Sequence, residues 1–256
     1  MPSSSNKPLV LITGANQGLG YATAKILVDS GEYHVILACR SLAKGIEAIN
    51  QLKSENPNVD TKALTPLVVD ITDDASITAA KDTVENEFGH LNILINSAAV
   101  NGQIPIRKPG LRENYQIIFD TNVFGVAIMT QTFLPLLRAS TYADRRIVNV
   151  TSGLGQIGVA LAEDSTYYAT NFPAPEYRSS KAALNMITAV DAVQLKSEGI
   201  HVILVAPGYT ATGLNAYSGR KTPSEGAVPI VRAATDGSGA QMTGKLHAEE
   251  LLEYGW

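Results

Sequence analysis

Short apolar runs recur along the chain, and longer stretches with apolar residues at every third or fourth position separate them. The runs cover residues 9–13, 34–39, 67–70, 91–96, 146–151 and 201–206. Because β-branched and aliphatic residues fill them almost without interruption, each run is typical of a strand that is buried on both faces of a sheet. A last strand is expected near residues 242–245.

The stretches between the runs have the spacing of amphipathic helices. Their apolar positions include Ala22, Ile26, Leu27, Ile46, Ile49, Leu52, Ile77, Val84 and Phe88. Strands that alternate with helices in this way run parallel and are joined by right-handed crossovers. We therefore predict an α/β fold, a doubly wound parallel sheet with helices on both faces in three layers, formed by a single domain over residues 1–256. Glycines and prolines interrupt residues 153–176, which we expect to form a long loop over the edge of the sheet.

The composition supports such a sheet and narrows the classes of partner. Hydrophobic residues make up 45% of the chain and charged residues 17%. The formal net charge of −4 offers no basic surface, so we expect no nucleic-acid partner. The lone Cys39 can form neither an internal disulfide nor a thiolate metal cluster, which fits a reducing, cytoplasmic location. The first apolar run is too short for a signal peptide or a membrane span, and we expect no membrane partner.

A glycine-rich turn follows the first strand directly, with Gly14, Gly18 and Gly20 in the segment Thr13-Gly-Ala-Asn-Gln-Gly-Leu-Gly20. Glycines let the backbone turn tightly and approach a pyrophosphate, which also gains from the N-terminus of the helix behind it. The same residues suit an ordinary strand-to-helix turn. Their place at the first strand–helix junction of an alternating chain nevertheless favours a dinucleotide-binding site.

The second strand ends at Arg40, where an NAD-binding protein commonly carries an acidic residue for the ribose 2′-hydroxyl. A guanidinium suits a 2′-phosphate, because its planar fork donates several charge-assisted hydrogen bonds, while a carboxylate repels that group. An arginine here can also be a solvated charge at the end of a strand. The position beside the glycine turn favours the first role and thus NADP(H) over NAD(H).

The pattern Tyr-x-x-x-Lys occurs three times, and only one copy has a suitable context. The copies are Tyr21 with Lys25, Tyr177 with Lys181, and Tyr217 with Lys221. The first lies on a surface-facing stripe of the helix behind the glycine turn. Glycine and proline around the third prevent a stable helix. Tyr177 instead begins a helical run over residues 177–196, on which Lys181 lies one turn away on the same face.

This spacing gives the phenol a chemical role. A nearby ammonium and an oxidised nicotinamide favour the phenolate, so we expect the pKa of Tyr177 to lie below its usual value of about 10. Tyr177 then acts as general acid or base in hydride transfer to a carbonyl carbon. Ser152 and Asn96 end two strands at the carboxyl edge of the sheet, where ligands bind. The Ser152 hydroxyl can hydrogen-bond the substrate oxygen or its own local backbone, and the residue alone does not decide between these roles.

The TGxxxGxG turn, Ser152 and the Tyr177-x-x-x-Lys181 pair together resemble the short-chain dehydrogenase/reductase family, in particular its carbonyl-reductase-like branch, over nearly the whole chain. The resemblance implies a Rossmann fold and an oxidoreductase whose catalytic residues are Asn122, Ser152, Tyr177 and Lys181. By the same resemblance the Asn122 side chain holds a water that contacts Lys181.

The cofactor-binding residues that the resemblance implies come from the glycine turn, the ends of the strands and the Tyr177 helix. They are Gly14, Asn16, Gln17, Gly18, Leu19, Arg40, Asp70, Ile71, Asn96, Tyr177, Lys181, Pro207, Tyr209, Thr210 and Thr212. Asp70 and Ile71 are assigned to the adenine end, and Asn96 to the ribose or the backbone scaffold. The last four residues are assigned to the nicotinamide side.

The chain departs from the family pattern at two places. After the fourth strand it reads Asn96-Ser-Ala-Ala99, where relatives usually read Asn-Asn-Ala-Gly, so we expect a slightly altered backbone path. The separation of Ser152 from Tyr177 is longer than in most relatives. The intervening loop either walls the substrate pocket or obstructs a helix pair through which many relatives dimerise, and the oligomeric state stays open. With a short lid after Thr212, we expect a wide pocket for bulky aldehydes or ketones.

The predicted function is the NADPH-dependent reduction of a ketone or aldehyde to an alcohol, or the reverse, with Tyr177 as general acid or base. One alternative is an NADP(H)-binding sensor or regulatory protein without significant turnover, against which the intact Ser152, Tyr177 and Lys181 speak. Another is an alcohol dehydrogenase that works mainly in the oxidative direction, since these residues do not set the direction. The partner is a small carbonyl or alcohol, whose identity the pattern does not fix.

Overall fold

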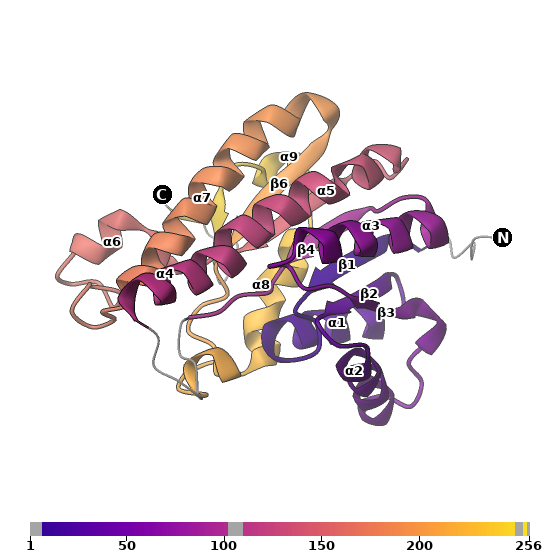
Figure 1. Cartoon of the computed structure of the whole chain (residues 1–256), viewed down its shortest axis with the longest axis horizontal. Coiled ribbons are helices and arrows are strands. Elements are labelled where there is room, and N and C mark those ends of the chain that lie inside the picture. Colours follow the sequence, from indigo (N-terminus) through magenta and orange to yellow (C-terminus); the bar gives the residue numbers. More distant parts are fainter. Residues whose placement is uncertain (1–6, 102–109, 249–252, 255–256) are drawn as a thin grey trace.

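The strands form one sheet in the middle of the molecule (Figure 1). The computed structural model describes residues 7–101, 110–248 and 253–254. The sheet order is β3-β2-β1-β4-β5-β6-β7-β8. The bounds are β1 Leu9–Thr13, β2 His34–Cys39, β3 Leu64–Val68, β4 Ile93–Asn96, β5 Arg145–Val150, β6 Ile200–Val205, β7 Leu246–His247 and β8 Glu253–Tyr254. Neighbouring strands are parallel from β3 to β7, which confirms the predicted doubly wound sheet. The edge strand β8 pairs antiparallel with β7, an addition to the all-parallel expectation.

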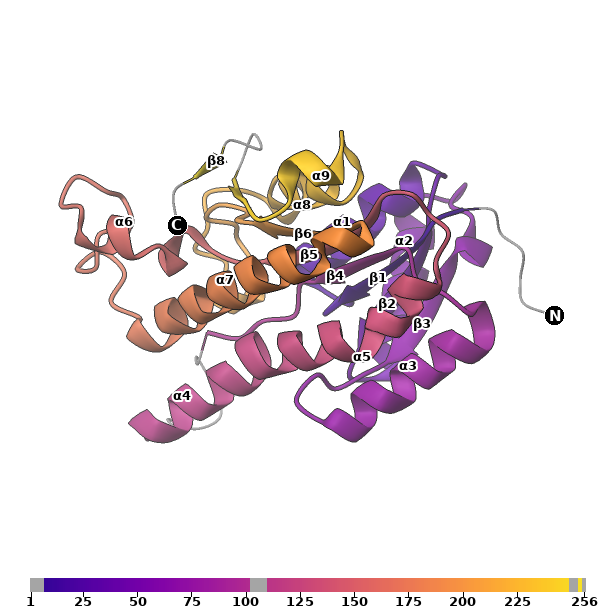
Figure 2. The same ribbon diagram turned by 90° about the horizontal axis from the view of Figure 1, so that it is seen from above.

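Helices cover both faces of the sheet, as Figure 2 shows from above. Their bounds are α1 Gly18–Asp29, α2 Leu42–Glu55, α3 Asp74–Phe88, α4 Leu111–Phe119, α5 Val126–Ala139, α6 Ile157–Leu161, α7 Pro175–Leu195, α8 Pro223–Thr235 and α9 Gly239–Met242. One apolar cluster joins the sheet to α3, α5 and α7, and a second joins its other face to α1, α2, α8 and α9. Two separate cores on opposite faces are what a fully buried parallel sheet requires.

The starts of β5 and β6 differ from the predicted ones by one residue and that of β4 by two, while β3 and β7 begin further from their predicted starts. β3 starts at Leu64 rather than at residue 67, because this edge strand is only partly buried and includes Pro66. Proline is tolerated on an edge strand, where its missing N–H leaves no ladder bond unmade. The last parallel strand starts at Leu246 rather than within 242–245. Met242 ends α9 instead, and Gly244, with φ of 68°, turns the backbone before the strand.

A long helical segment runs from Leu111 to Ala139 through α4, a π-helical turn η2 over Asp120–Gly125, and α5. Within the described residues, this is the one helix long and apolar enough to cross a membrane by length and composition alone. Half of its most apolar window is buried inside the fold. Met129, Phe133 and Leu137 belong to the core against the sheet, so packing accounts for its apolar character.

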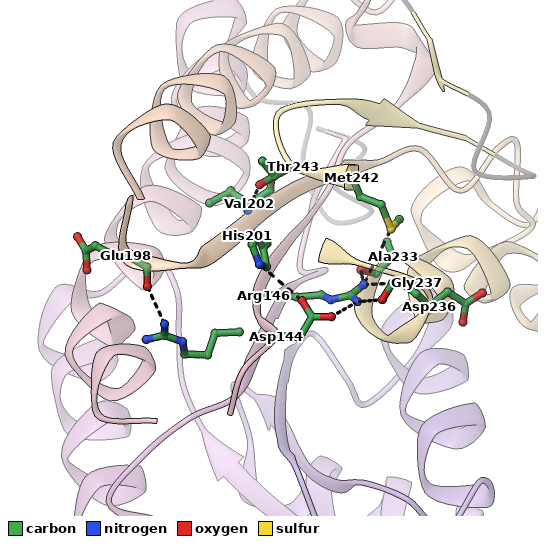
Figure 3. Close-up of polar contacts among 11 residues, drawn as sticks. Asp144, Arg146, Glu198, His201, Val202, Ala233, Asp236, Gly237, Met242 and Thr243 are labelled. Carbon is green, nitrogen blue, oxygen red and sulfur yellow. Dashed lines mark hydrogen bonds and ion pairs between the residues drawn. The ribbon is translucent and has the colours of Figure 1, made fainter. Parts of the chain in front are cut away.

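A buried arginine ties the C-terminal part of the chain to the amino end of β5 (Figure 3). Arg146 is 1% exposed, and its guanidinium donates to the carbonyl oxygens of Ala233 at 2.8 Å, Asp236 at 3.0 Å and Gly237 at 3.1 Å. It also forms an ion pair of 2.5 Å with Asp144. The carbonyls belong to the last turn of α8 and the loop behind it, so one side chain satisfies backbone groups that the helix leaves open.

Candidate active site

A cavity of about 800 Å³ opens at the carboxyl edge of the sheet. Its lining comes from the glycine turn behind β1, the ends of β2 and β5, and the segments that follow β3, β4 and β6. This is the edge where open α/β sheets bind ligands. All the predicted cofactor-binding residues except Asn96 line it. Among the described residues, no cluster of histidine, cysteine and acidic side chains is arranged to hold a metal ion.

The glycine turn needs its glycines for geometric reasons. Gly14 and Gly18 have φ angles of 68° and 56°, which L side chains rarely adopt. A Cβ on Gly20 would lie 2.4 Å from the carbonyl oxygen of Gly14, so only hydrogen fits between the turn and α1. This bare backbone at the start of a helix fits the pyrophosphate of a dinucleotide, because N–H groups and the helix dipole both favour an anion there.

The segment after β4 packs against this turn without a glycine. The Thr13 hydroxyl accepts hydrogen bonds of 3.0 Å from the backbone N–H groups of both Ser97 and Ala98. Ala98 lies so close that a Cβ on Gly14 would be 3.1 Å from its Cα. Ala98 and Ala99 keep ordinary φ angles, which explains why alanines are accepted where relatives commonly have Ala-Gly.

Opposite charges lie in the cavity beyond the ends of β2 and β3, where the sequence predicts the adenosine end of the cofactor. Arg40 is exposed and lines the cavity, as does Asp70. Burial opposes ionisation of Asp70, but hydrogen bonds from Thr72 and the positive charge of Arg40 hold its pKa below the usual value. The Thr72 backbone and hydroxyl donate to one Asp70 oxygen at 3.0 and 2.7 Å. Asp70 is thus held as a hydrogen-bond acceptor, and the exposed Arg40 presents a cationic fork of the kind that suits a phosphate.

Ser152, Tyr177 and Lys181 meet in the cavity beside the end of β5. A hydrogen bond joins the Ser152 and Tyr177 hydroxyls. The Ser152 hydroxyl also accepts a hydrogen bond of 3.2 Å from the backbone N–H of Leu154. Ser152 therefore both bonds its local backbone, one of the two roles considered for it, and contacts the tyrosine. Lys181 is buried, donates to the Val150 carbonyl at 2.9 Å, and lies 5.7 Å from the centre of the Tyr177 ring.

The acid–base properties of this pair differ from the expectation. Burial raises the pKa of Tyr177 to about 12, and the hydrogen bond with Ser152 offsets this only in part. Burial also lowers the pKa of Lys181 to about 8. Desolvation, and not the neighbouring ammonium, thus sets the pKa of the phenol here, and the part of the expectation that involves a bound oxidised nicotinamide stays a prediction. At neutral pH the phenol keeps its proton and is a proton donor.

Asn122 lies beneath the cavity rather than in its wall. It is buried in η2, and its side-chain amide accepts from the Val100 N–H and donates to the Val100 carbonyl, both at 2.8 Å. The same amide donates to the Ser180 hydroxyl at 3.1 Å. Both amide hydrogens are thus taken by protein groups, so a relay water could be held only through the remaining acceptor position of the amide oxygen. Asn122 clamps the β4 segment to α7 between Tyr177 and Lys181.

Asn96 also points into the fold. Its amide donates to Asn149 at 2.8 Å and to Thr130 at 3.3 Å, and Asn149 donates onward to Thr188 at 2.9 Å. These buried amides link β4, β5, α5 and α7. The scaffold role given for Asn96 fits this placement, whereas its side chain is not placed to contact a ribose in the cavity.

The segment after β6 covers the glycine turn. Pro207, Tyr209, Thr210 and Thr212 all line the cavity, and a Cβ on Gly18 would lie 3.6 Å from Thr212. Neither of the other two tyrosine–lysine pairs has the context of Tyr177, as predicted, although Tyr217 also lines the cavity. Tyr21 donates to Glu55 at 3.1 Å, which ties α1 to α2, and Tyr217 lies in a turn with φ of 61°.

The loop between Ser152 and Tyr177 lines the cavity, which confirms the alternative that it walls the pocket, with Tyr167 and Phe172 in the lining. Sequence reasoning did not single out Phe172, nor Arg178, which lies next to Tyr177 and donates to carbonyl oxygens of this segment. The segment has no hydrophobic period, so its side-chain directions leave no signal in the sequence. The only hint was its richness in tyrosine and proline.

Comparisons with known proteins agree with this geometry. A family model described as short chain dehydrogenase matches residues 8–223. Short-chain dehydrogenase anuI of Penicillium roqueforti is 55% identical over 252 residues, which cover 98% of each chain. An NADPH-bound carbonyl reductase from chicken fatty liver has a TM-score of 0.81 at 26% identity and covers 98% of this chain and 99% of its own. Salutaridine reductase from Papaver somniferum has a TM-score of 0.75 at 28% identity, with coverages of 94% and 99%.

Proposed function

Because the chain belongs to the short-chain dehydrogenase family of oxidoreductases, we propose that it reduces a ketone or aldehyde to an alcohol with NADPH, and that Tyr177 donates the proton. One observation carries the proposal: Tyr177, hydrogen-bonded to Ser152 and one turn from Lys181, lines the same cavity as the glycine turn. The residues of that cavity fit the cofactor, with Gly14, Gly18 and Gly20 for its pyrophosphate.

When bound, NADPH supplies a hydride to the carbonyl carbon. Negative charge then develops on the carbonyl oxygen, and the protonated Tyr177 hydroxyl donates its proton there. The Ser152 hydroxyl hydrogen-bonds the same oxygen and stabilises the growing charge. Lys181, still charged at neutral pH and fixed on the Val150 carbonyl, stabilises the phenolate that remains. Because burial raises the pKa of Tyr177, its hydroxyl carries the proton that reduction consumes, and the same group takes the proton back when an alcohol is oxidised.

Arg40 supports the choice of NADPH. It lines the cavity at the end of β2, where a carboxylate would repel a 2′-phosphate. The NADPH in the carbonyl reductase from chicken fatty liver is consistent with this assignment. The proposal includes a cytoplasmic location, supported by the buried free Cys39, and a small carbonyl compound as partner.

The proton role predicts the behaviour of Tyr177→Phe. Removing only the hydroxyl should lower kcat by about 10²- to 10⁴-fold, because the alkoxide loses its proton donor. The dissociation constant for NADPH should change by less than about threefold, since the ring that packs in the cavity remains. Stopped-flow absorbance of NADPH during ketone reduction and titration of NADPH fluorescence measure the two quantities. Turnover at the wild-type rate would contradict the proposal.

The cofactor assignment predicts the behaviour of Arg40→Asp. The KM for NADPH should rise by about a hundredfold, because charge-assisted hydrogen bonds are lost and a repulsive charge replaces them. The KM for NADH should change far less. Lys53→Asp is the matched control, since it makes the same change of charge on the exposed surface of α2 away from the cavity. Equal effects of Arg40→Asp on both cofactors would remove the 2′-phosphate assignment.

A further inference from the structure

Three aromatic side chains form one wall of the cavity. Tyr167 and Phe172 belong to the connection between α6 and α7, and Tyr209 follows β6. The Tyr167 and Phe172 ring centres lie 6.1 Å apart at an interplanar angle of 53°, and those of Phe172 and Tyr209 lie 5.6 Å apart at 72°. The Tyr209 hydroxyl shares a hydrogen bond of 2.7 Å with Ser218, which fixes that ring. We call these three residues the aromatic wall.

The aromatic wall lies next to the reacting groups. A Cβ on Gly153 would come within 2.9 Å of the Tyr167 ring, so the ring lies directly on the residue that follows Ser152. Only a glycine at position 153 allows this approach. A substrate whose carbonyl oxygen reaches Ser152 and Tyr177 therefore has its next groups beside Tyr167.

Arg178 holds the aromatic wall from behind. Its Nε donates to the Phe172 carbonyl at 3.0 Å, and its terminal nitrogens donate to the carbonyls of Tyr167 and, at 3.5 Å, of Leu154. The described partners of this guanidinium are thus backbone carbonyls on both sides of the wall. Arg178 directly follows Tyr177 in α7, so the helix that presents the proton donor also fixes the wall.

The described lining carries charge only away from the aromatic wall. Its charged residues are Arg40 and Asp70, at the adenosine end, and Lys181, which is bonded to Val150 beneath Tyr177. A charged substrate group placed at the wall would lose its hydration without gaining a charged partner in the described lining, because Arg178 does not line the cavity and its guanidinium is bonded to backbone carbonyls. An aromatic ring there gains edge-to-face contacts, which a saturated ring of equal size lacks.

We propose that the aromatic wall is a binding subsite for an uncharged aromatic ring of the carbonyl substrate, and that Arg178 is the positioning residue that holds this subsite against Ser152. The inference rests on the proposed function and adds the class of substrate: ketones or aldehydes that carry a neutral aryl group near the carbonyl.

Two ketones with the same skeleton test the subsite: 4-phenylbutan-2-one and 4-cyclohexylbutan-2-one. Neither ring is conjugated to the carbonyl, so the reactivity of the carbonyl is matched. We expect kcat/KM to favour the phenyl compound by about tenfold. The ring-carboxylated analogue 4-(3-oxobutyl)benzoate should react at least about tenfold less efficiently than the phenyl compound.

Phe172→Leu should reduce the preference for the phenyl ketone to about one, because the central ring of the wall is replaced by an aliphatic group of similar volume. Phe124→Leu is the matched control: Phe124 is 53% exposed on η2, does not line the cavity, and should leave the preference unchanged. Equal efficiency of the two ketones in the wild type, or an unchanged preference in Phe172→Leu, would overturn the subsite.

Arg178→Lys separates positioning from a general structural role. A lysine keeps the charge but cannot bridge carbonyls on both sides of the wall. We expect KM for 4-phenylbutan-2-one to rise about tenfold while kcat and the efficiency with 4-cyclohexylbutan-2-one change little. Equal losses for both ketones would show that Arg178 only supports the fold and would overturn its positioning role.

Binding to the NADP⁺-loaded protein keeps the subsite distinct from catalysis. Calorimetric titration with each ketone should give tighter binding of 4-phenylbutan-2-one, with or without turnover. Tighter binding of 4-phenylbutan-2-one without any NADPH oxidation would contradict the proposed reaction but support the subsite. Turnover of both ketones with equal affinity and equal rate would support the reaction but contradict the subsite.

Discussion

Tyr177 and Lys181 lie one helical turn apart, and both are withdrawn from water. The lysine motif alone favours the view that its charge makes the phenol acidic. Burial instead raises the pKa of Tyr177 to about 12 and lowers that of Lys181 to about 8, so desolvation dominates for both groups. Residue types and spacing identified the pair. The protonation of both groups depends on how deeply the fold buries them, and burial cannot be predicted from the spacing of two residues.

The lowered pKa of Lys181 predicts how the stability of the cofactor-free protein depends on pH. Below pH 8 the lysine is protonated in both folded and unfolded states, and the fold bears the full cost of burying the ammonium. Between about 8 and its ordinary value of 10.5 the unfolded state binds more protons, so stability rises with pH. Relative to Lys181→Met, the wild type should gain about 2 kcal/mol of unfolding free energy between pH 7 and pH 9.5. Urea unfolding measures this gain, and parallel pH profiles of the two proteins would contradict it.

Asparagines illustrate the same limit. Asn96 and Asn122 were identified by their motifs, yet the fold uses both amides to join elements instead of placing them in the cavity wall. A polar side chain at the end of a strand or inside a helix has several possible partners. The sequence indicates that an asparagine is needed at such a position. Which hydrogen bonds its side chain makes depends on the residues that pack around it.

Elements differ in how far their sequence determines them. β1 and β2 match the predicted ranges to the residue, because strands buried on both faces carry an unbroken apolar signal. β3 and β7, near the two edges of the sheet, are less regular, and their starts were misplaced. The π-helical turn over Asp120–Gly125 was not foreseen, since its residues read as ordinary helix. The connection that carries Tyr167 and Phe172 has no period at all, so the substrate side of the site was the least predictable part.

At the scale of the whole molecule, the cavity lies at the carboxyl ends of the strands, and the Arg146 anchor lies at their amino ends. β5 ends beside Ser152 in the cavity and begins beside Arg146, which binds the loop after α8. The buried Arg146 was hidden in the sequence within an apolar run that reads as core. Its charge is offset by Asp144 and three backbone carbonyls. Removing the arginine would leave these groups without their partner and would lower the free energy of unfolding.

Arg146→Met should therefore destabilise the protein by roughly 3–5 kcal/mol, because Asp144 and the carbonyls lose their partner. Arg145→Met is the matched control: that neighbour is only half-buried and donates to the Glu198 carbonyl at 2.6 Å, so its loss should cost less than about half as much. Denaturant midpoints compare the two variants, and kcat/KM of the folded fraction of each should stay near the wild-type value. A milder effect of Arg146→Met than of Arg145→Met would refute the anchoring role.

The placement of Arg146 also bears on how such a protein can change over evolutionary time. The Arg146 guanidinium fixes the loop after α8 at the amino edge of the sheet, far from the aromatic wall at the carboxyl edge. Substitutions in the aromatic wall therefore leave this anchor intact. Substrate preference can then change one substitution at a time while the fold stays stable.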